Sequence, residues 1–137
     1  ERVHSLEDGS AAEALDRQAG GLGRKIQVLI EMNTSGEESK HGVRSLDRAR
    51  VLAEGLLGLE HLELTGMMTL GPYPPGETQS RNAFARLRET RDRLIPALGR
   101  PLHELSMGMS EDLEWAIMEG STLVRVGRAL FGERPRT

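Results

Sequence analysis

Hydrophobic positions along the chain follow two alternating spacings, and this alternation predicts a repeated strand–helix pattern. Residues 25–32 (KIQVLIEM) form a nearly continuous apolar run, which is typical of a parallel strand covered by helices. After Ser45, apolar residues recur instead at helical spacing. A chain that alternates in this way builds a parallel sheet with right-handed crossovers. We therefore predict an α/β fold.

Five strands and five helices are expected in alternating order. The expected strands are residues 2–6, 25–32, 62–68, 102–106 and 123–126. The expected helices begin at a capping box on Ser10, at a cap on Ser45, near residue 78 for a long helix to 98, at a cap on Ser110, and at Ala129. No repeat or linker composition interrupts the series, so residues 1–137 are expected to form part of one domain.

Composition narrows the function classes. The net charge is −3 without a basic block, and aromatic residues make up only 3%, which disfavours nucleic-acid binding. No apolar run approaches the roughly 20 residues of a membrane span, and no signal-peptide pattern opens the chain. Without cysteine there is no thiolate site or disulfide. A cytoplasmic protein is expected.

Residues 106–132 (SMGMSEDLEWAIMEGSTLVRVGRALFG) hold the strongest candidate site. Two expected helix N-termini, hydroxyl groups, glycines and an arginine converge there, and together they favour an anionic ligand, above all phosphate. Arg125, within an apolar strand, is either ion-paired to a neighbouring carboxylate or directed at a ligand. Gly127 and Arg128 are either a plain turn or backbone N–H donors. Ser110 is a helix cap that can also touch an anion.

Several other residues qualify this picture. Glu111 and Asp112 would repel a phosphate, so they must point outward if an anion binds nearby. The segment at Asn33, Thr34 and Ser35 suits either a turn or ligand donors, while Lys40 and His41 are expected to be solvated. His4 and His103 lack partners at metal-binding spacing, so a zinc site is not expected.

Four motifs give the chain a family resemblance. They are NTSGEESK at 33–40, TGMMT at 65–69, LSMGMS at 105–110 and GSTLVRVGRALFG at 120–132. On these motifs the sequence resembles the pyridoxal-phosphate homeostasis proteins, the YggS/PROSC family. The resemblance implies part of a (β/α)8 TIM barrel of the alanine-racemase N-terminal-domain type, roughly strands 4 to 8, that holds pyridoxal 5′-phosphate (PLP) at its C-terminal face.

The resemblance also assigns roles to the candidate residues. It implies that the Ser110 hydroxyl and the backbone N–H groups of Gly127 and Arg128 bind the phosphate, and that Arg125 faces the pyridine nitrogen or the phosphate. The family's Schiff-base lysine lies in an N-terminal part that this chain lacks, and neither Lys25 nor Lys40 has its context. We therefore expect a partial sequence that cannot hold PLP covalently by itself.

Two functions follow from the resemblance. The first is a non-catalytic PLP-binding protein that buffers the cofactor or delivers it to apo-enzymes, as a monomer. The second is a PLP-dependent amino-acid racemase, which needs a second acid/base, usually a tyrosine from an added C-terminal domain. Tyr73 is the only tyrosine and lies in a Pro-rich loop, and the chain ends soon after its last motif, so the first function is favoured.

Overall fold

The computed structural model describes residues 1–133, and the last four residues of the expected domain lie outside the described part. Four parallel strands form one sheet in the order in which they occur along the chain. They are β1 (Arg2–Leu6), β2 (Ile26–Met32), β3 (Leu62–Thr69) and β4 (Glu104–Ser106). The α/β class predicted from the sequence is therefore confirmed.

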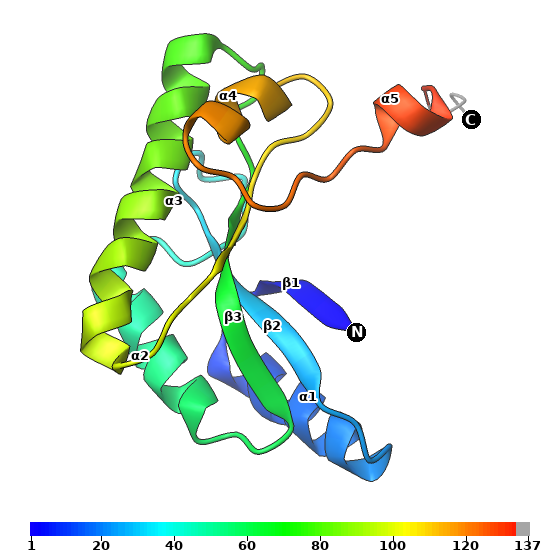
Figure 1. Ribbon diagram of the computed structural model, residues 1–137, viewed down its shortest axis with the longest axis vertical. Helices are drawn as coiled ribbons and strands as arrows, with labels where there is room; N and C mark the ends of the chain where they lie inside the picture. The colour runs from blue at the N-terminus through cyan, green and yellow to red at the C-terminus, as the bar shows by residue number, and fades with distance from the viewer. Residues whose placement is uncertain (134–137) are drawn as a thin grey trace.

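Within residues 1–133, five helices alternate with or follow these strands. The three longer ones, α1 (Gly9–Gly21), α2 (Leu46–Leu57) and α3 (Glu77–Leu98), connect successive strands and lie on one face of the sheet (Figure 1). They are followed by α4 (Leu113–Met118) and the one-turn α5 (Arg128–Phe131). In Figure 1, α5 lies at the end of an extended segment that leads away from the sheet.

The hydrophobic core lies between the sheet and the three longer helices. Successive side chains of a strand point to opposite faces, so Val28 and Ile30 of β2 enter this core. Their helical partners repeat every three or four residues, as Leu52 and Leu56 do in α2. The largest buried side chain is Phe84 of α3, which is fully enclosed.

Two helix starts test the capping predictions. Ser45 caps α2 as predicted, because its side chain accepts a hydrogen bond from the Arg48 N–H at 3.3 Å. The start of α1 lies earlier than the capping box on Ser10 predicts. Asp8 is the N-cap and accepts from Ala11 N–H at 2.7 Å, while the Ser10 hydroxyl donates to the Asp8 carboxylate.

The prediction of a strand at residues 123–126 is wrong, because no strand forms there. Leu123 forms only an isolated bridge to Ser106, and the segment runs beside β4 with few backbone bonds. One reason is that the Ser121 hydroxyl occupies carbonyl oxygens that a ladder would use, including that of Met107 at 2.6 Å. A second is that Gly108 has φ +100°, which turns the neighbouring chain out of strand geometry. The described sheet thus has four strands rather than five.

Gly66 allows β3 and β4 to approach. The pairing of β2 with β3 skips Thr65, which makes a bulge just before this glycine. A Cβ atom built on Gly66 would lie 2.0 Å from the Glu104 carbonyl oxygen, so only glycine fits here. The TGMM sequence therefore has a packing role, because it brings Ser106 of β4 level with Met68 of β3.

The second face of the sheet is concave and carries polar side chains. Arg2 of β1 donates to the Gln27 side chain at 2.7 Å and lies 3.7 Å from the Glu104 carboxylate of β4. One level further along, His4 of β1 bonds Ser106 of β4 at 2.8 Å. The two edge strands are therefore close enough for their side chains to meet, which requires the strong curvature of a barrel wall.

Candidate functional site

The residues that the sequence singles out lie in the segments that follow the C-terminal end of β4. Ser110 lies in the turn after β4, and its hydroxyl accepts a hydrogen bond from the Ala129 N–H in the first turn of α5 at 3.2 Å. Ser110 does not cap α4, because that helix begins later, with Asp112 at the N-cap position. The Ser110 side chain therefore contacts the start of α5 and not the start of α4, the helix that follows it in the sequence.

Gly127 and Arg128 provide the backbone of the same group. Within residues 1–133, neither of their N–H groups donates to another part of the chain. The Arg128 side chain turns instead to the Glu111 carboxylate at 2.9 Å. These two N–H groups and the Ser110 hydroxyl form a small set of donors on an exposed turn, where an anion can reach them.

Arg125 is held by two oxygen atoms of the strand ends. Its Nη1 donates to the Ser106 hydroxyl at 2.5 Å and its Nη2 donates to the Thr69 carbonyl at 2.9 Å. Among residues 1–133 no carboxylate lies within 4.0 Å of the guanidinium, so the ion pair considered from the sequence does not form. Burial lowers the pKa of Arg125, with Asp112 and Glu31 opposing the change.

The two acidic residues after Ser110 take different positions. Glu111 is half exposed and is neutralised by Arg128. Asp112 is buried, and its carboxylate accepts from the Met109 N–H at 2.7 Å. The expectation that both side chains point outward is therefore wrong for Asp112, because this carboxylate is needed to close the turn that carries Ser110.

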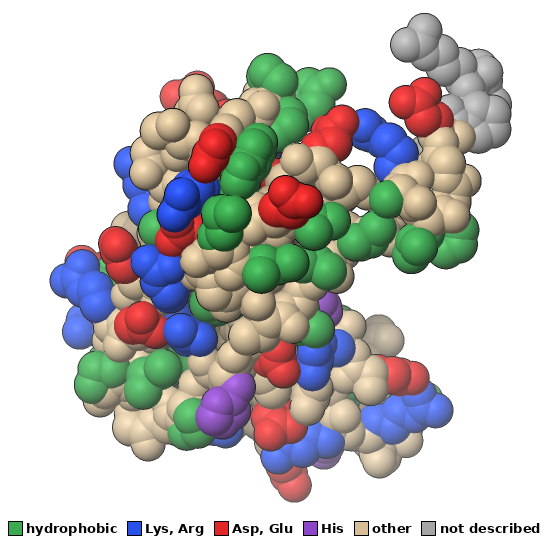
Figure 2. All heavy atoms as spheres, turned by 45° about the horizontal axis from the view of Figure 1, so that its top comes forward, with side chains coloured by type: hydrophobic (Ala, Val, Ile, Leu, Met, Phe, Trp, Pro, Cys, Tyr) green, Lys and Arg blue, Asp and Glu red, His purple; other side chains and the backbone are tan. Residues whose placement is uncertain are grey.

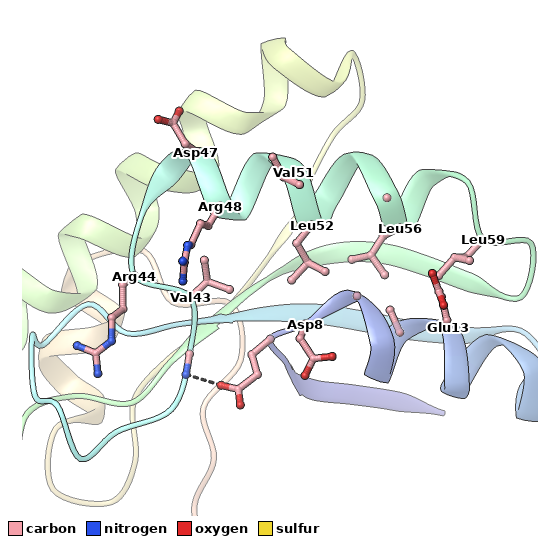
Figure 3. Close-up of a pocket in the computed structure, with 15 residues that line it drawn as sticks. Asp8, Glu13, Val43, Arg44, Asp47, Arg48, Val51, Leu52, Leu56 and Leu59 are labelled. Atoms are coloured by element: carbon pink, nitrogen blue, oxygen red, sulfur yellow. Dashed lines mark hydrogen bonds between the residues drawn. The ribbon is translucent and has the colours of Figure 1, made fainter.

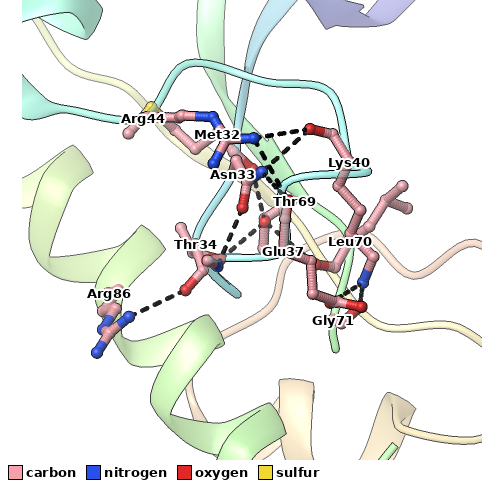
Figure 4. A network of polar contacts seen from close by, with 11 residues as sticks. Met32, Asn33, Thr34, Glu37, Lys40, Arg44, Thr69, Leu70, Gly71 and Arg86 are labelled. Carbon is pink, nitrogen blue, oxygen red and sulfur yellow. Dashed lines mark hydrogen bonds and ion pairs between the residues drawn. The ribbon is translucent and has the colours of Figure 1, made fainter. Parts of the chain in front are cut away.

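The loop after β2 is connected to Arg125 through Thr69. The buried Asn33 side chain donates to the carbonyls of Glu37 and Lys40, at 2.8 and 3.1 Å, and closes the loop on itself (Figure 4). Thr34 bonds the Thr69 hydroxyl at 2.8 Å, next to the carbonyl that holds Arg125. Asn33 thus acts as a turn former, whereas the Thr34 hydroxyl joins this loop to the end of β3.

Lys40 is part of this loop and is not solvated as the sequence suggested. Its ammonium group lies 2.6 Å from the Glu37 carboxylate and also donates to the Gly71 carbonyl (Figure 4). The hydrogen bond from Lys40 to the Glu37 carboxylate is the main reason that the pKa of Glu37 is below its usual range. Lys40 therefore joins the loop after β2 to the loop after β3.

Three further polar residues face the same concavity, and the sequence pattern did not indicate them as site residues. They are His4, Ser106 and Glu31. Glu31 is buried at the end of β2, where burial raises its pKa, nearby Glu7 raises it further, and His41 and Arg125 oppose the change. Each of the three lies at a strand position that alternates with core residues, and that alternation is the signal that could have identified them.

A separate groove lies on the outer face between α1 and α2 (Figure 3). It has a volume of about 640 Å³, and its floor is formed by Val43, Leu52 and Leu56. Charged side chains of both signs, such as Asp8 and Arg48, lie along its rim. None of Ser110, Arg125, Gly127 or Arg128 lines it, so it is separate from the candidate anion site.

Two other structural features are absent from residues 1–133. No helix there has the length and apolar character needed to cross a membrane. In the same residues, no three histidine or carboxylate side chains gather closely enough to hold a metal ion. Tyr73, the one tyrosine, is 76% exposed.

Comparison with known proteins connects this geometry to a family. Residues 2–135 match the family described as alanine racemase, N-terminal domain. A protein of Aquifex aeolicus named pyridoxal phosphate homeostasis protein is 42% identical over 132 residues, which cover 96% of this chain and 58% of that protein. The chain therefore spans little more than half of this relative.

Solved structures agree with this result. The structure of PipY from Synechococcus elongatus with PLP bound is 32% identical, with a TM-score of 0.82, and the match covers 96% of this chain and 60% of PipY. An alanine racemase of Clostridium difficile is 17% identical with a TM-score of 0.76, over 98% of this chain and 37% of the racemase, and shows the shared fold alone. The chain thus belongs to the alanine racemase N-terminal domain family and is similar to proteins named pyridoxal phosphate homeostasis protein.

Proposed function

We propose that this chain forms the phosphate-and-ring half of a PLP site in a non-catalytic protein that buffers the cofactor or delivers it to other proteins. The observation that carries the proposal is the donor set around Ser110. Its hydroxyl contacts the Ala129 N–H in the first turn of α5, and the preceding N–H groups of Gly127 and Arg128 donate to no acceptor within residues 1–133.

The chemistry of these residues fits PLP. A phosphate monoester presents three acceptor oxygens, and the group around Ser110 consists of donors. An arginine guanidinium has five N–H donors and cannot be a base, so Arg125 can donate to a pyridine nitrogen while it keeps its two oxygen partners. PLP, when bound, supplies an electron-withdrawing ring and an aldehyde to the site.

Arg125 also bears on the choice between a carrier and an enzyme. An arginine beside the ring nitrogen keeps that nitrogen unprotonated and weakens the ring as an electron sink, which suits a carrier or a racemase better than a decarboxylase. A racemase needs a second acid/base opposite the first, and the side chain of Tyr73 is exposed rather than enclosed in a site. The names of the relatives also favour cofactor homeostasis.

The proposal extends to the protein's surroundings. It takes the protein to be a cytoplasmic monomer whose partners are PLP and PLP-requiring apo-enzymes, without nucleic acid or membrane. Covalent attachment is assigned to a lysine outside this chain, since neither Lys25 nor Lys40 stands beside the donor set. The Lys40 ammonium group is occupied by Glu37 and Gly71.

The test is a titration of the full-length gene product with PLP, followed by absorbance, together with an assay for alanine racemisation. The expected result is saturable binding of PLP that inorganic phosphate weakens, with no racemisation above the rate of free PLP. Steady racemisation would support the second function, a racemase. An absence of PLP binding would contradict both functions.

A further inference from the structure

Three side chains from distant parts of the chain form one hydrogen-bonded row across the concave face. Arg125 donates to the Ser106 hydroxyl oxygen at 2.5 Å, and this oxygen lies 2.8 Å from Nδ1 of His4. Ser106 is completely buried, so water cannot replace either neighbour. The row begins on β1, passes β4 and ends at the residue proposed to face the PLP ring.

Chemistry fixes the donor at one end of this row and favours one order at the other end. A guanidinium has no acceptor, so the Ser106 oxygen must accept from Arg125. The hydroxyl has a single hydrogen of its own, and His4 Nδ1 is the partner within reach. An Nδ1 that accepts satisfies this hydrogen, and in this arrangement His4 is a neutral imidazole with its hydrogen on Nε2.

Protonation of His4 would reverse this order. Nδ1–H would become a second donor toward the Ser106 oxygen, and the hydroxyl hydrogen would lose its acceptor. The charged His4 ring would also be separated from the Arg125 guanidinium by only the Ser106 hydroxyl. Burial lowers the pKa of His4, with Arg125 and then Arg2 adding to the effect and Glu104 opposing it. Glu31 and Asp112 are the other charged groups near Arg125.

We propose that His4 and Ser106 are positioning residues that hold the Arg125 guanidinium in the orientation required for the PLP ring. This proposal rests on the proposed function, because it takes the ring as the target of Arg125. Ser106 fixes Nη1, and Thr69 fixes Nη2 through its carbonyl, so the plane of the guanidinium is set by two points. His4 supplies the acceptor without which Ser106 could not be oriented.

The first test does not require PLP. Nitrogen-15 NMR of the histidine rings in the full-length protein should show His4 as the Nε2–H tautomer at pH 7.5, with a pKa below 6.5. Arg125→Gln removes a positive neighbour and should raise the pKa of His4. A charged His4 at pH 7.5, or an Nδ1–H tautomer, would overturn the proposed order of donors.

The second test measures PLP affinity against pH in three variants. His4→Ala and Ser106→Ala should each weaken PLP binding about tenfold at pH 7.5, the loss expected for a misplaced charge-assisted hydrogen bond. His4→Asn places an amide oxygen near the position of Nδ1 and should recover most of the affinity that His4→Ala loses. The exposed His103, changed to Gln, is the matched control and should bind PLP like the wild type.

The pH profile separates positioning from a structural role. The phosphate of PLP titrates in the same range, but it does so equally in wild type and in His4→Asn. The affinity of the wild type relative to His4→Asn should therefore fall as the pH drops below 6.5. A ratio that stays constant with pH would overturn the inference while leaving PLP binding intact. If the wild type binds no PLP, the proposed function fails, and the NMR result alone decides the hydrogen-bond order.

Discussion

His4 Nδ1 and the Ser106 hydroxyl lie 2.8 Å apart although 102 positions separate them in the sequence. One residue belongs to the first strand of the sheet and the other to the fourth, so this contact crosses the whole concave face. The Ser106 hydroxyl in turn receives the Arg125 guanidinium. The position of the Arg125 guanidinium thus depends on both edges of the sheet, and replacement of Arg125 should weaken ligand binding.

Arg125→Gln is expected to weaken PLP binding by about tenfold or more, because a glutamine amide lacks the charge and the two-point geometry of a guanidinium. Fluorescence titration of the full-length protein with PLP measures the change. Arg100→Gln, at an exposed position after α3, is the matched control and should leave the affinity unchanged. Equal affinities of Arg125→Gln and wild type would contradict the role proposed for Arg125.

Ser110→Ala should reduce the affinity for PLP but not for pyridoxal, which has no phosphate. The variant removes a hydroxyl that touches the first turn of α5, so the expected loss is that of one charge-assisted hydrogen bond, about 1.5–3 kcal/mol. Competition titrations with both ligands measure the two affinities. Ser39→Ala, at an exposed loop position, serves as control. A similar loss for both ligands would argue against a phosphate contact.

The sequence predicts the elements well where local signals and packing agree. The strand at 25–32, the cap at Ser45 and the long third helix lie within a residue of their expected bounds. At residues 123–126 the local signal is equally apolar, but hydroxyl groups take the available carbonyls and only a bridge forms. A strand needs a neighbour that can complete its ladder, and composition alone does not report this.

The candidate site shows the same limit. The sequence motifs identify Ser110 and Arg125, because glycines, hydroxyl groups and a lone cation in an apolar run are visible locally. The motifs do not show that His4 and Ser106 hold Arg125 in place, since these two residues meet only after the sheet has curved. The inward position of Asp112 is a matter of turn geometry, where its carboxylate is needed by the Met109 N–H.

Gly66→Ala is expected to destabilise the fold strongly, by more than about 3 kcal/mol, because its Cβ would overlap the Glu104 backbone and push β4 away from β3. Urea denaturation of the full-length protein measures the free energy of unfolding. Gly55→Ala is the matched control of opposite sign: this glycine lies inside α2 with open space around it, and alanine should add about 0.5–1 kcal/mol there. Equal effects of the two changes would show that the β3–β4 approach is adaptable.

Glu119 ties α4 to α3 and thereby holds the turn that carries Ser110. Its carboxylate receives Arg81 at 2.9 Å and Arg88 at 2.7 Å, and Arg88 also donates to its backbone carbonyl. These contacts, first from Arg88 and then from Arg81, lower the pKa of Glu119. Glu119→Gln keeps the shape of the side chain but loses its charge, and it should cost about 1–2 kcal/mol of unfolding free energy at pH 7.

The pH dependence of this loss has a definite sign. Because the pKa of Glu119 is lowered from 4.5 on folding, the unfolded chain binds the proton more readily, and the contribution is complete at pH values above 4.5. It should decline as the pH falls below 4.5 and through the lowered pKa of the folded state, so urea curves of wild type and Glu119→Gln should differ by a constant amount above pH 4.5 and converge below it. Glu54→Gln, in an exposed pair with Arg50 at 3.9 Å, should change stability by less than about 0.5 kcal/mol throughout. A difference between wild type and Glu119→Gln that stays constant below pH 4.5 as well would show that the side chain acts by packing and not by charge.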